Sequence, residues 1–130
     1  MREDLGKLIL RVTVGALLLF HGVHKLLNGI APIKAMLASR NLPEALSYGV
    51  YLGEIAGPIL LVLGAFSRIG AGLVVVNMAV AVALAGASRL AAFDPMGGYA
   101  LELEAFFLFG ALAVLFLGAG RLSLGGGRWN

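Results

Sequence analysis

The sequence predicts an all-α integral membrane protein, a four-helix bundle with a short interfacial helix between its first and second spans. Of the 130 residues, 60% are hydrophobic and 13% are charged, and the mean hydropathy is +0.95. A soluble globular domain has roughly 25% charged residues, so this chain is too apolar for that class. Four apolar stretches approach the length of about 20 residues that a bilayer-spanning helix needs. They are residues 5–27, 45–66, 69–87 and 100–119, and we treat residues 1–130 as one membrane domain.

The first span contains the most informative polar side chains. Arg11, His21, His24 and Lys25 lie inside or near the edge of residues 5–27. An ionised group near the centre of a membrane helix costs on the order of 3 kcal/mol on insertion scales, so such groups persist when they are paired, lead to water or have a function. For Arg11, we expect a side chain that snorkels to the lipid headgroups.

The connection between the first and second spans is the longest one. Pro32 is favoured in the first turn of a helix, and Ile33, Met36 and Leu37 recur at helical spacing until Pro43 ends the element. We therefore predict a short helix that lies on the outer surface of the membrane.

The remaining connections are short or contain turn signals. Residues 67–68 are expected to form a tight hairpin between the second and third spans. Residues 88–99 contain an Asp-Pro pair and a Gly-Gly pair, which are typical of turns. After the fourth span, the glycine-rich residues 125–127 show no periodicity, so we expect a mobile tail there.

Small residues explain how the spans approach one another. Lipid provides no hydrophobic driving force between helices, so close packing depends on small side chains and on hydrogen bonds across helices. Gly53 and Gly57 form a GxxxG pair, and Gly15 and Gly22 lie on the first span. In the middle of the third span, Asn77 is expected to hydrogen-bond to a neighbouring helix.

These polar side chains predict one cluster in the outer half of the bundle. The cluster is expected to consist of His21, Lys25, Glu54 and Glu102, with His24 and Asn28 at its rim. Helix geometry does not choose between Glu102 and Glu104, and Glu102 is preferred only because of the resemblance described below. At about 100° per residue, Arg11 shares a broad helix face with His21 and Lys25. A carboxylate beside a histidine can relay protons, and Lys or His can donate a hydrogen bond to a quinone carbonyl or an oxyanion. The alternative is a buried structural network that fixes the helix register.

Several other classes of site find no support in the sequence. The chain has no cysteine, which excludes disulfides and thiol chemistry. Its net charge of +3 comes from basic residues spread along the chain, so we expect no nucleic-acid partner. We also expect no metal site and no intrinsic cofactor, since flavin, nicotinamide and iron–sulfur motifs are absent.

A set of short motifs occurs in a specific order along the chain. The motifs are Arg11, FHGVHKL at residues 20–26, Glu54 with Gly57, GAFSRIGA at residues 64–71 and GAGRLSL at residues 118–124. In order and spacing they resemble the DoxX family of small four-span bacterial membrane proteins over nearly the whole chain. Family members commonly have Asp after the last motif, whereas this chain has Gly125.

The resemblance implies a redox role in the bacterial cytoplasmic membrane. Relatives include a subunit of a thiosulfate:quinone oxidoreductase and a membrane partner of superoxide dismutase and a sulfurtransferase. We therefore expect a component of an oxidoreductase assembly, linked to oxidative stress, that contacts redox-enzyme partners and binds quinone or a small anionic sulfur compound in the polar cluster. The alternatives are a non-enzymatic assembly or stress-response scaffold and a small transporter or proton pathway. Whether the chain is itself catalytic and whether it forms a homo-oligomer stay open.

We predict that both termini are cytoplasmic. With four spans, the side that holds the termini has five Lys or Arg residues and the opposite loops have three, and the basic side of a membrane protein faces the cytoplasm. Reporter fusions after Asn130 and within residues 88–99 should therefore report opposite sides of the membrane. An external carboxyl terminus would contradict this orientation.

Overall fold

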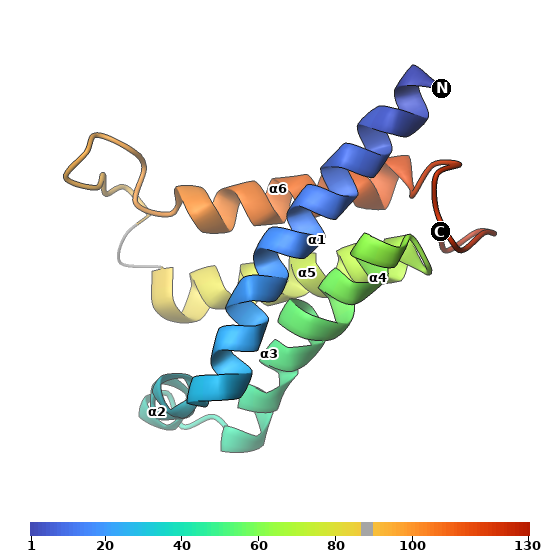
Figure 1. Ribbon diagram of the computed structural model, residues 1–130. Coiled ribbons are helices and arrows are strands. Elements are labelled where there is room, and N and C mark those ends of the chain that lie inside the picture. The colour runs from blue at the N-terminus through green and yellow to red at the C-terminus, as the bar shows by residue number, and fades with distance from the viewer. Residues whose placement is uncertain (87–89) are drawn as a thin grey trace.

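The computed structural model describes residues 1–86 and 90–130, and the regular elements named in these ranges are all helical. Helix α1 (Arg2–Asn28) crosses the molecule diagonally, and the short helix α2 (Ala31–Ser39) lies at its end (Figure 1). Helix α1 contains the whole expected first span. Helix α2 confirms the predicted short helix, although it ends before Pro43.

The second span is built from four consecutive helical pieces. They are the 3-10 helix η1 (Glu44–Tyr48), the α-helix α3 (Gly49–Tyr51), the π-helix η2 (Leu52–Ala56) and the α-helix α4 (Gly57–Leu63). This segment follows the expected second span closely but ends three residues earlier, because Gly64 adopts a left-handed conformation with φ 72° and ends α4.

The helices of the expected third and fourth spans lie side by side. Helix α5 (Ser67–Ala81) continues into the π-helix η3 (Val82–Gly86), and α6 (Glu102–Leu117) packs along α5 (Figure 1). The expected third span is therefore confirmed as far as residue 86, and its last residue lies outside the described part. The helix of the expected fourth span, α6, is 16 residues long.

Among the described residues, three helices are long and apolar enough to cross a membrane. They are Arg2–Asn28, Glu44–Leu63 and Ser67–Leu84. Helix α6 falls short of them in length, so the predicted number of four spans is not established by this criterion.

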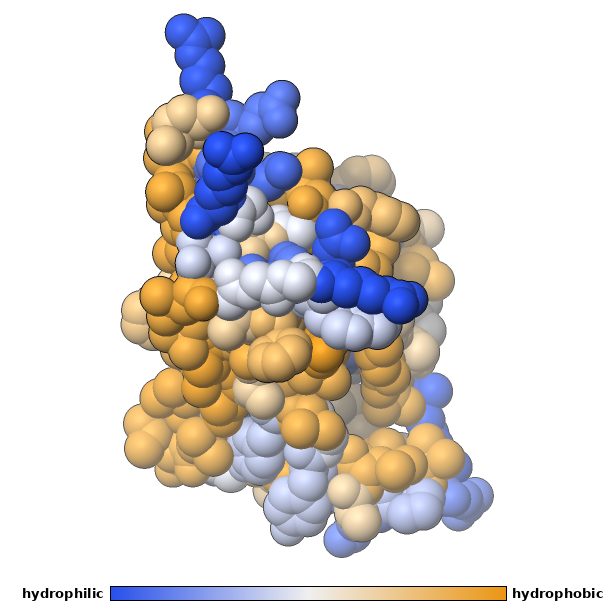
Figure 2. Space-filling model, turned by 90° about the vertical axis from the view of Figure 1, so that its right-hand side faces the viewer, coloured by the Kyte–Doolittle hydropathy of each residue, from blue (hydrophilic) through white to orange (hydrophobic). Residues whose placement is uncertain are grey.

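The described part has a core that joins α1, α4, α5 and α6. Leu18, Leu61, Val74, Ala111 and Val114 are at most 1% exposed and belong to one cluster. Many large apolar side chains lie on the outside instead, and hydrophobic residues cover much of the face in Figure 2. Such extensive exposed apolar surface is expected of a protein whose surroundings are lipid.

Helix α2 is fixed to the second and third spans at one end of the bundle. Lys34 Nζ donates to the hydroxyl of Tyr48 at 2.9 Å, and this hydrogen bond raises the pKa of Lys34. Just after α2, Arg40 Nη2 donates to the main-chain oxygen of Leu84 at 2.8 Å. Both contacts hold α2 and the residue after it against neighbouring segments at this end of the bundle.

The opposite end brings together both termini and the turn between α4 and α5 (Figure 1). This turn consists of residues 64–66, and Ser67 and Arg68 already belong to α5. The predicted tight hairpin is therefore present, but its turn consists of residues 64–66 and not of residues 67–68. Hydropathy does not reveal this position, since the left-handed Gly64 decides where α4 stops.

The segment after α6 is anchored to the bundle, so the expectation of a mobile tail at residues 125–127 is wrong. The N–H group of Leu124 donates to the carbonyl of Leu63 at 3.2 Å. The N–H group of Gly125 donates to the carbonyl of Gly64 at 2.9 Å. These bonds satisfy carbonyls at the end of α4 that have no partner within the helix.

Arg11 joins the same end from inside the bundle. Its residue exposure is 1%, so the expectation that it snorkels to the headgroups is wrong. The guanidinium donates to the carbonyls of Leu61 at 2.7 Å and Val62 at 3.0 Å, in the last turn of α4. It also donates to the carbonyls of Ala119, at 3.2 Å, and Leu122 in the segment after α6. The five N–H groups of a guanidinium suit several acceptors at once, and the end of a helix has partial negative charge.

We predict that Arg11→Met lowers the stability of the protein by about 3 kcal/mol or more, because several buried carbonyls lose their donor. Arg11→Lys should recover part of the loss, since an ammonium reaches fewer of these carbonyls than the planar guanidinium. Thermal unfolding in detergent measures both effects. Arg2→Met, at an exposed position of α1, is the matched control, and equal unfolding temperatures for Arg11→Met and Arg2→Met would contradict the prediction.

Candidate functional site

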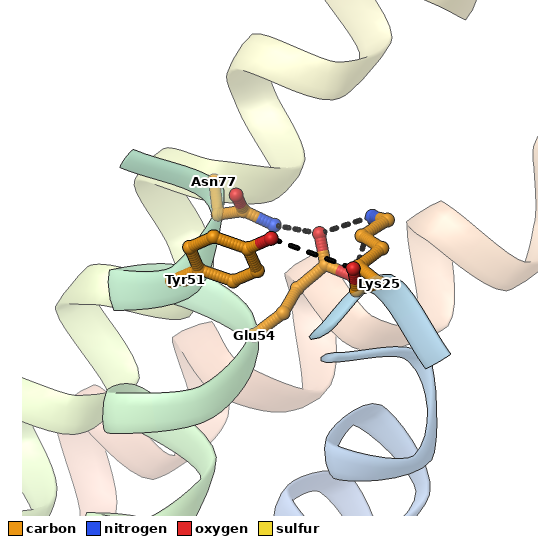
Figure 3. Close-up of polar contacts among 4 residues, drawn as sticks. All are labelled: Lys25, Tyr51, Glu54 and Asn77. Carbon is orange, nitrogen blue, oxygen red and sulfur yellow. Dashed lines mark hydrogen bonds and ion pairs between the residues drawn. The ribbon is translucent and has the colours of Figure 1, made fainter. Parts of the chain in front are cut away.

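A polar network joins three helical segments near the α2 end of the bundle (Figure 3). Lys25 Nζ of α1 lies 2.7 Å from Glu54 Oε1 and 2.6 Å from Glu54 Oε2 of η2. Asn77 of α5 donates from Nδ2 to Glu54 Oε2 at 3.1 Å. The predicted partnership of Lys25 and Glu54 is thus confirmed as a contact, as is the hydrogen bond of Asn77 across helices.

The two charged members differ in their burial. The side chain of Glu54 is 4% exposed, whereas that of Lys25 is 29% exposed. An ammonium group has three N–H donors, and the two oxygens of Glu54 account for two of them. The carboxylate is therefore enclosed, while the partly exposed ammonium has a donor for a further acceptor.

Two glycines allow the three segments to approach so closely. A Cβ atom added at Gly22 of α1 would collide with the main-chain carbonyl of Glu54. A Cβ atom added at Gly53 would likewise collide with the side chain of Asn77. The expected role of small residues is confirmed at these positions, and it explains how one carboxylate reaches both neighbouring helices.

Glu54 lies in a π-helix, and Pro58 accounts for the change in helix type. Proline has no N–H group, so Pro58 cannot donate to the carbonyl of Glu54 four residues earlier. At this point the N–H group of Gly57 donates to the carbonyl of Leu52, five residues earlier, as in a π-helix. Single π turns are frequent at functional sites, because they change the direction of the side chains within a helix.

Tyr51 is a member of this site that the sequence reasoning missed. Its hydroxyl donates to the main-chain oxygen of Lys25 at 3.4 Å (Figure 3). Tyr51 precedes Glu54 by three residues, and residues at this spacing share one face of a helix. That spacing is the signal that could have identified it.

The other predicted site residues lie outside the hydrogen bonds of this network in the described part of the chain. His21 is exposed, and its ring meets Phe107 of α6 edge to face with 5.8 Å between the ring centroids. His24 and Asn28 are exposed and contact each other, with 3.2 Å between His24 Nδ1 and Asn28 Nδ2. Glu102 is exposed in the first turn of α6. Their functional roles stay predictions.

An apolar groove of about 780 Å³ runs between α1 and α6. We call it the α1–α6 groove. Its lining includes Leu10 and Leu17 of α1 and Phe106 and Phe107 of α6. His21 follows Leu17 by one helical turn and contacts Phe107, so the imidazole stands at one end of this groove.

We predict that substitutions of Lys25 and Glu54 are strongly coupled in their effects on the stability of the protein. Lys25→Met leaves the enclosed carboxylate of Glu54 without its cation, which typically costs about 3–5 kcal/mol. Glu54→Gln should cost less, because the ammonium that remains is partly exposed. Both changes together should cost less than the sum of the two, with a coupling energy of roughly 1–3 kcal/mol. A double-mutant cycle read by unfolding in detergent measures this coupling.

The matched control for this cycle combines Glu54→Gln with His24→Ala, which removes an exposed side chain of the same helix. These two changes should add, because the described network does not include His24. Strict additivity in the Lys25 cycle as well would show that the two charges do not depend on each other.

Comparison with known proteins agrees with this architecture. The family model described as DoxX matches residues 6–87, more than half of the chain, and this stretch contains the whole network of Lys25, Glu54 and Asn77. Neither curated proteins nor solved structures gave a match. The match confirms the resemblance seen in the sequence, and together with the long apolar helices it shows that this chain is a membrane protein of the DoxX family.

Proposed function

We propose that the protein is a four-span component of an oxidoreductase assembly in the bacterial cytoplasmic membrane and that it binds a quinone at the His21 end of the α1–α6 groove. The observation that supports this proposal most is the position of His21, a polar and exposed side chain at the end of an apolar groove. A quinone combines a ring with two carbonyl acceptors and a long apolar chain, which are the chemical features that such a site would accommodate.

The proposal includes α6 as the fourth span. Its 16 residues extend over about 24 Å at the rise of an α-helix, compared with a hydrocarbon core of about 30 Å. Leu101 and Ala119, just outside its two ends, are 3% and 1% exposed, so the buried segment is longer than the helix. The ends of α6 also lie at the same two ends of the molecule as those of α5 (Figure 1).

The α1–α6 groove suits the apolar chain of a quinone. Its walls are aliphatic and aromatic side chains, and half of the Leu17 side chain remains exposed along it. Burial of each CH₂ group of a ligand contributes about 0.8 kcal/mol, although lipid already shields much of that surface here. The groove would therefore mainly align the chain and place the ring next to the imidazole.

His21 and Lys25 would then contact the quinone ring. They are one helical turn apart on α1, and each has an N–H group that can donate to a carbonyl oxygen. Reduction of a quinone to a quinol takes up two electrons and two protons. In this proposal, the partner enzymes of the assembly would supply both electrons. The imidazole of His21 would transfer one proton to the nearer carbonyl oxygen and be reprotonated from water, and the other carbonyl oxygen would take its proton from water.

Mass spectrometry of lipids that copurify with the protein tests this proposal. We expect a bound quinone in the unmodified protein and about tenfold less after His21→Ala, which removes a hydrogen bond to the ring. Leu17→Trp should also reduce the bound quinone, since the larger side chain fills the groove. His24→Ala and Leu26→Trp are the matched controls, because both change exposed residues of α1 that do not line the groove.

Complementation of a deletion strain provides the functional readout. We expect His21→Ala to reach normal membrane levels and to fail to restore resistance to oxidants or sulfur stress, whereas His24→Ala restores it. Full complementation by His21→Ala and by Glu54→Gln, with no quinone in the lipid extract, would instead favour a non-enzymatic scaffold. The network across three segments would then serve only to hold the helices in register.

A further inference from the structure

A second cavity lies at the opposite end of the molecule from the polar network. Its volume is about 370 Å³, and it is open to the outside and bordered by the start of α1, the start of α5 and the segment after α6. The cationic side chains in its lining are Lys7, Arg68 and Arg121, and Asp4 contributes one carboxylate. Glycine main chain forms most of the remaining wall. Figure 2 shows this end of the molecule, where hydrophilic residues gather beside a hydrophobic surface.

The carboxylate of Asp4 already has partners. Its Oδ1 atom accepts a hydrogen bond from the main-chain N–H of Arg121 at 3.0 Å. Its Oδ2 atom lies 4.0 Å from the amino group of Met1. The lining therefore contains three cationic side chains and one carboxylate that already has partners, so the summed charge of its side chains is positive.

Arg68 provides a second and independent indication of a missing anion. Its Nε atom is buried and, in the described part of the chain, has no hydrogen-bond acceptor. A buried donor without an acceptor is costly, and more so for a charged group. Beside it lies Gly118, where an added Cβ atom would be 3.1 Å from Arg68 Nη2. Because glycine has no side chain to accept a bond, a ligand in the cavity could supply the acceptor.

We propose that this cavity binds a phosphate group. Guanidinium groups match the oxygens of phosphate in geometry and charge, and lysine adds a compact positive charge. Glycine-rich main chain allows a phosphate to approach N–H groups closely. The site is distinct from the quinone site proposed above and does not depend on it.

Two sources could provide this phosphate. The cavity lies at the end of the apolar helices, at the level where lipid headgroups meet the protein, and clusters of Lys and Arg at this level bind anionic headgroups. A soluble phosphate would reach the same side chains from the aqueous phase. Phosphatidylglycerol and inorganic phosphate are therefore the two probes that distinguish these sources.

The test uses the full chain in phosphatidylcholine nanodiscs. Native mass spectrometry measures the retention of phosphatidylglycerol after it is mixed into the nanodiscs, and calorimetric titration measures the binding of inorganic phosphate. Arg68→Gln and Lys7→Gln should each weaken binding about tenfold, as expected for the loss of one charged hydrogen bond. Arg2→Gln removes an exposed cation of α1 that does not line the cavity, and it should leave binding unchanged.

The outcomes separate the sources and decide the proposal. Selective retention of phosphatidylglycerol without a response to inorganic phosphate supports a headgroup site, and a response to inorganic phosphate supports a site for soluble phosphate. Binding of neither probe overturns the proposal. Equal weakening by Arg2→Gln and Lys7→Gln also overturns it, because binding would then follow the overall charge of this end. Should Arg68→Gln fail to fold, Lys7→Gln and the exposed Arg121→Gln decide the question.

Discussion

A bilayer cannot hydrate a charge, and this constraint determines how both ends of the bundle are joined. At the α2 end, the carboxylate of Glu54 binds Lys25 of α1 and Asn77 of α5, so three helical segments meet at one buried group. At the other end, the guanidinium of Arg11 binds main-chain carbonyls of α4 and of the segment after α6. Both of these polar groups are thereby satisfied by segments distant in sequence, which fixes the relative positions of those segments.

The polar contacts of Glu54 and those of Arg11 differ in whether they leave a hydrogen-bond donor for a ligand. The guanidinium of Arg11 is 1% exposed and its donors are directed to carbonyl oxygens, which is a structural arrangement. Lys25 remains partly exposed and has one N–H donor beyond the two that bind Glu54. The α2 end therefore keeps a donor for a ligand, whereas the guanidinium of Arg11 at the other end is enclosed.

The sequence predicted most of the fold and part of the site, and the successes share a physical basis. Hydropathy located the helices, because lipid requires apolar side chains along their length. The need to pair a buried charge connected Lys25 with Glu54. The failures involve main-chain groups, which sequence patterns do not display: Arg11 binds carbonyls, and the tail is anchored by N–H groups. Glu102 was placed in the cluster from family resemblance, since angular geometry gave no preference between it and Glu104.

The enclosure of Glu54 also bears on which ligand the site would accept. A small sulfur anion could bind Lys25 in place of Glu54, and the carboxylate of Glu54, with 4% side-chain exposure, would then lose its cation. A buried charge without a partner typically costs about 3–5 kcal/mol. An anion that bound beside the pair would instead be repelled by the same carboxylate. The carbonyl of the proposed quinone is neutral and would require only the remaining N–H group of the ammonium, so the ion pair would stay intact. The electrostatics of the network thus favour the same ligand as the apolar lining of the groove.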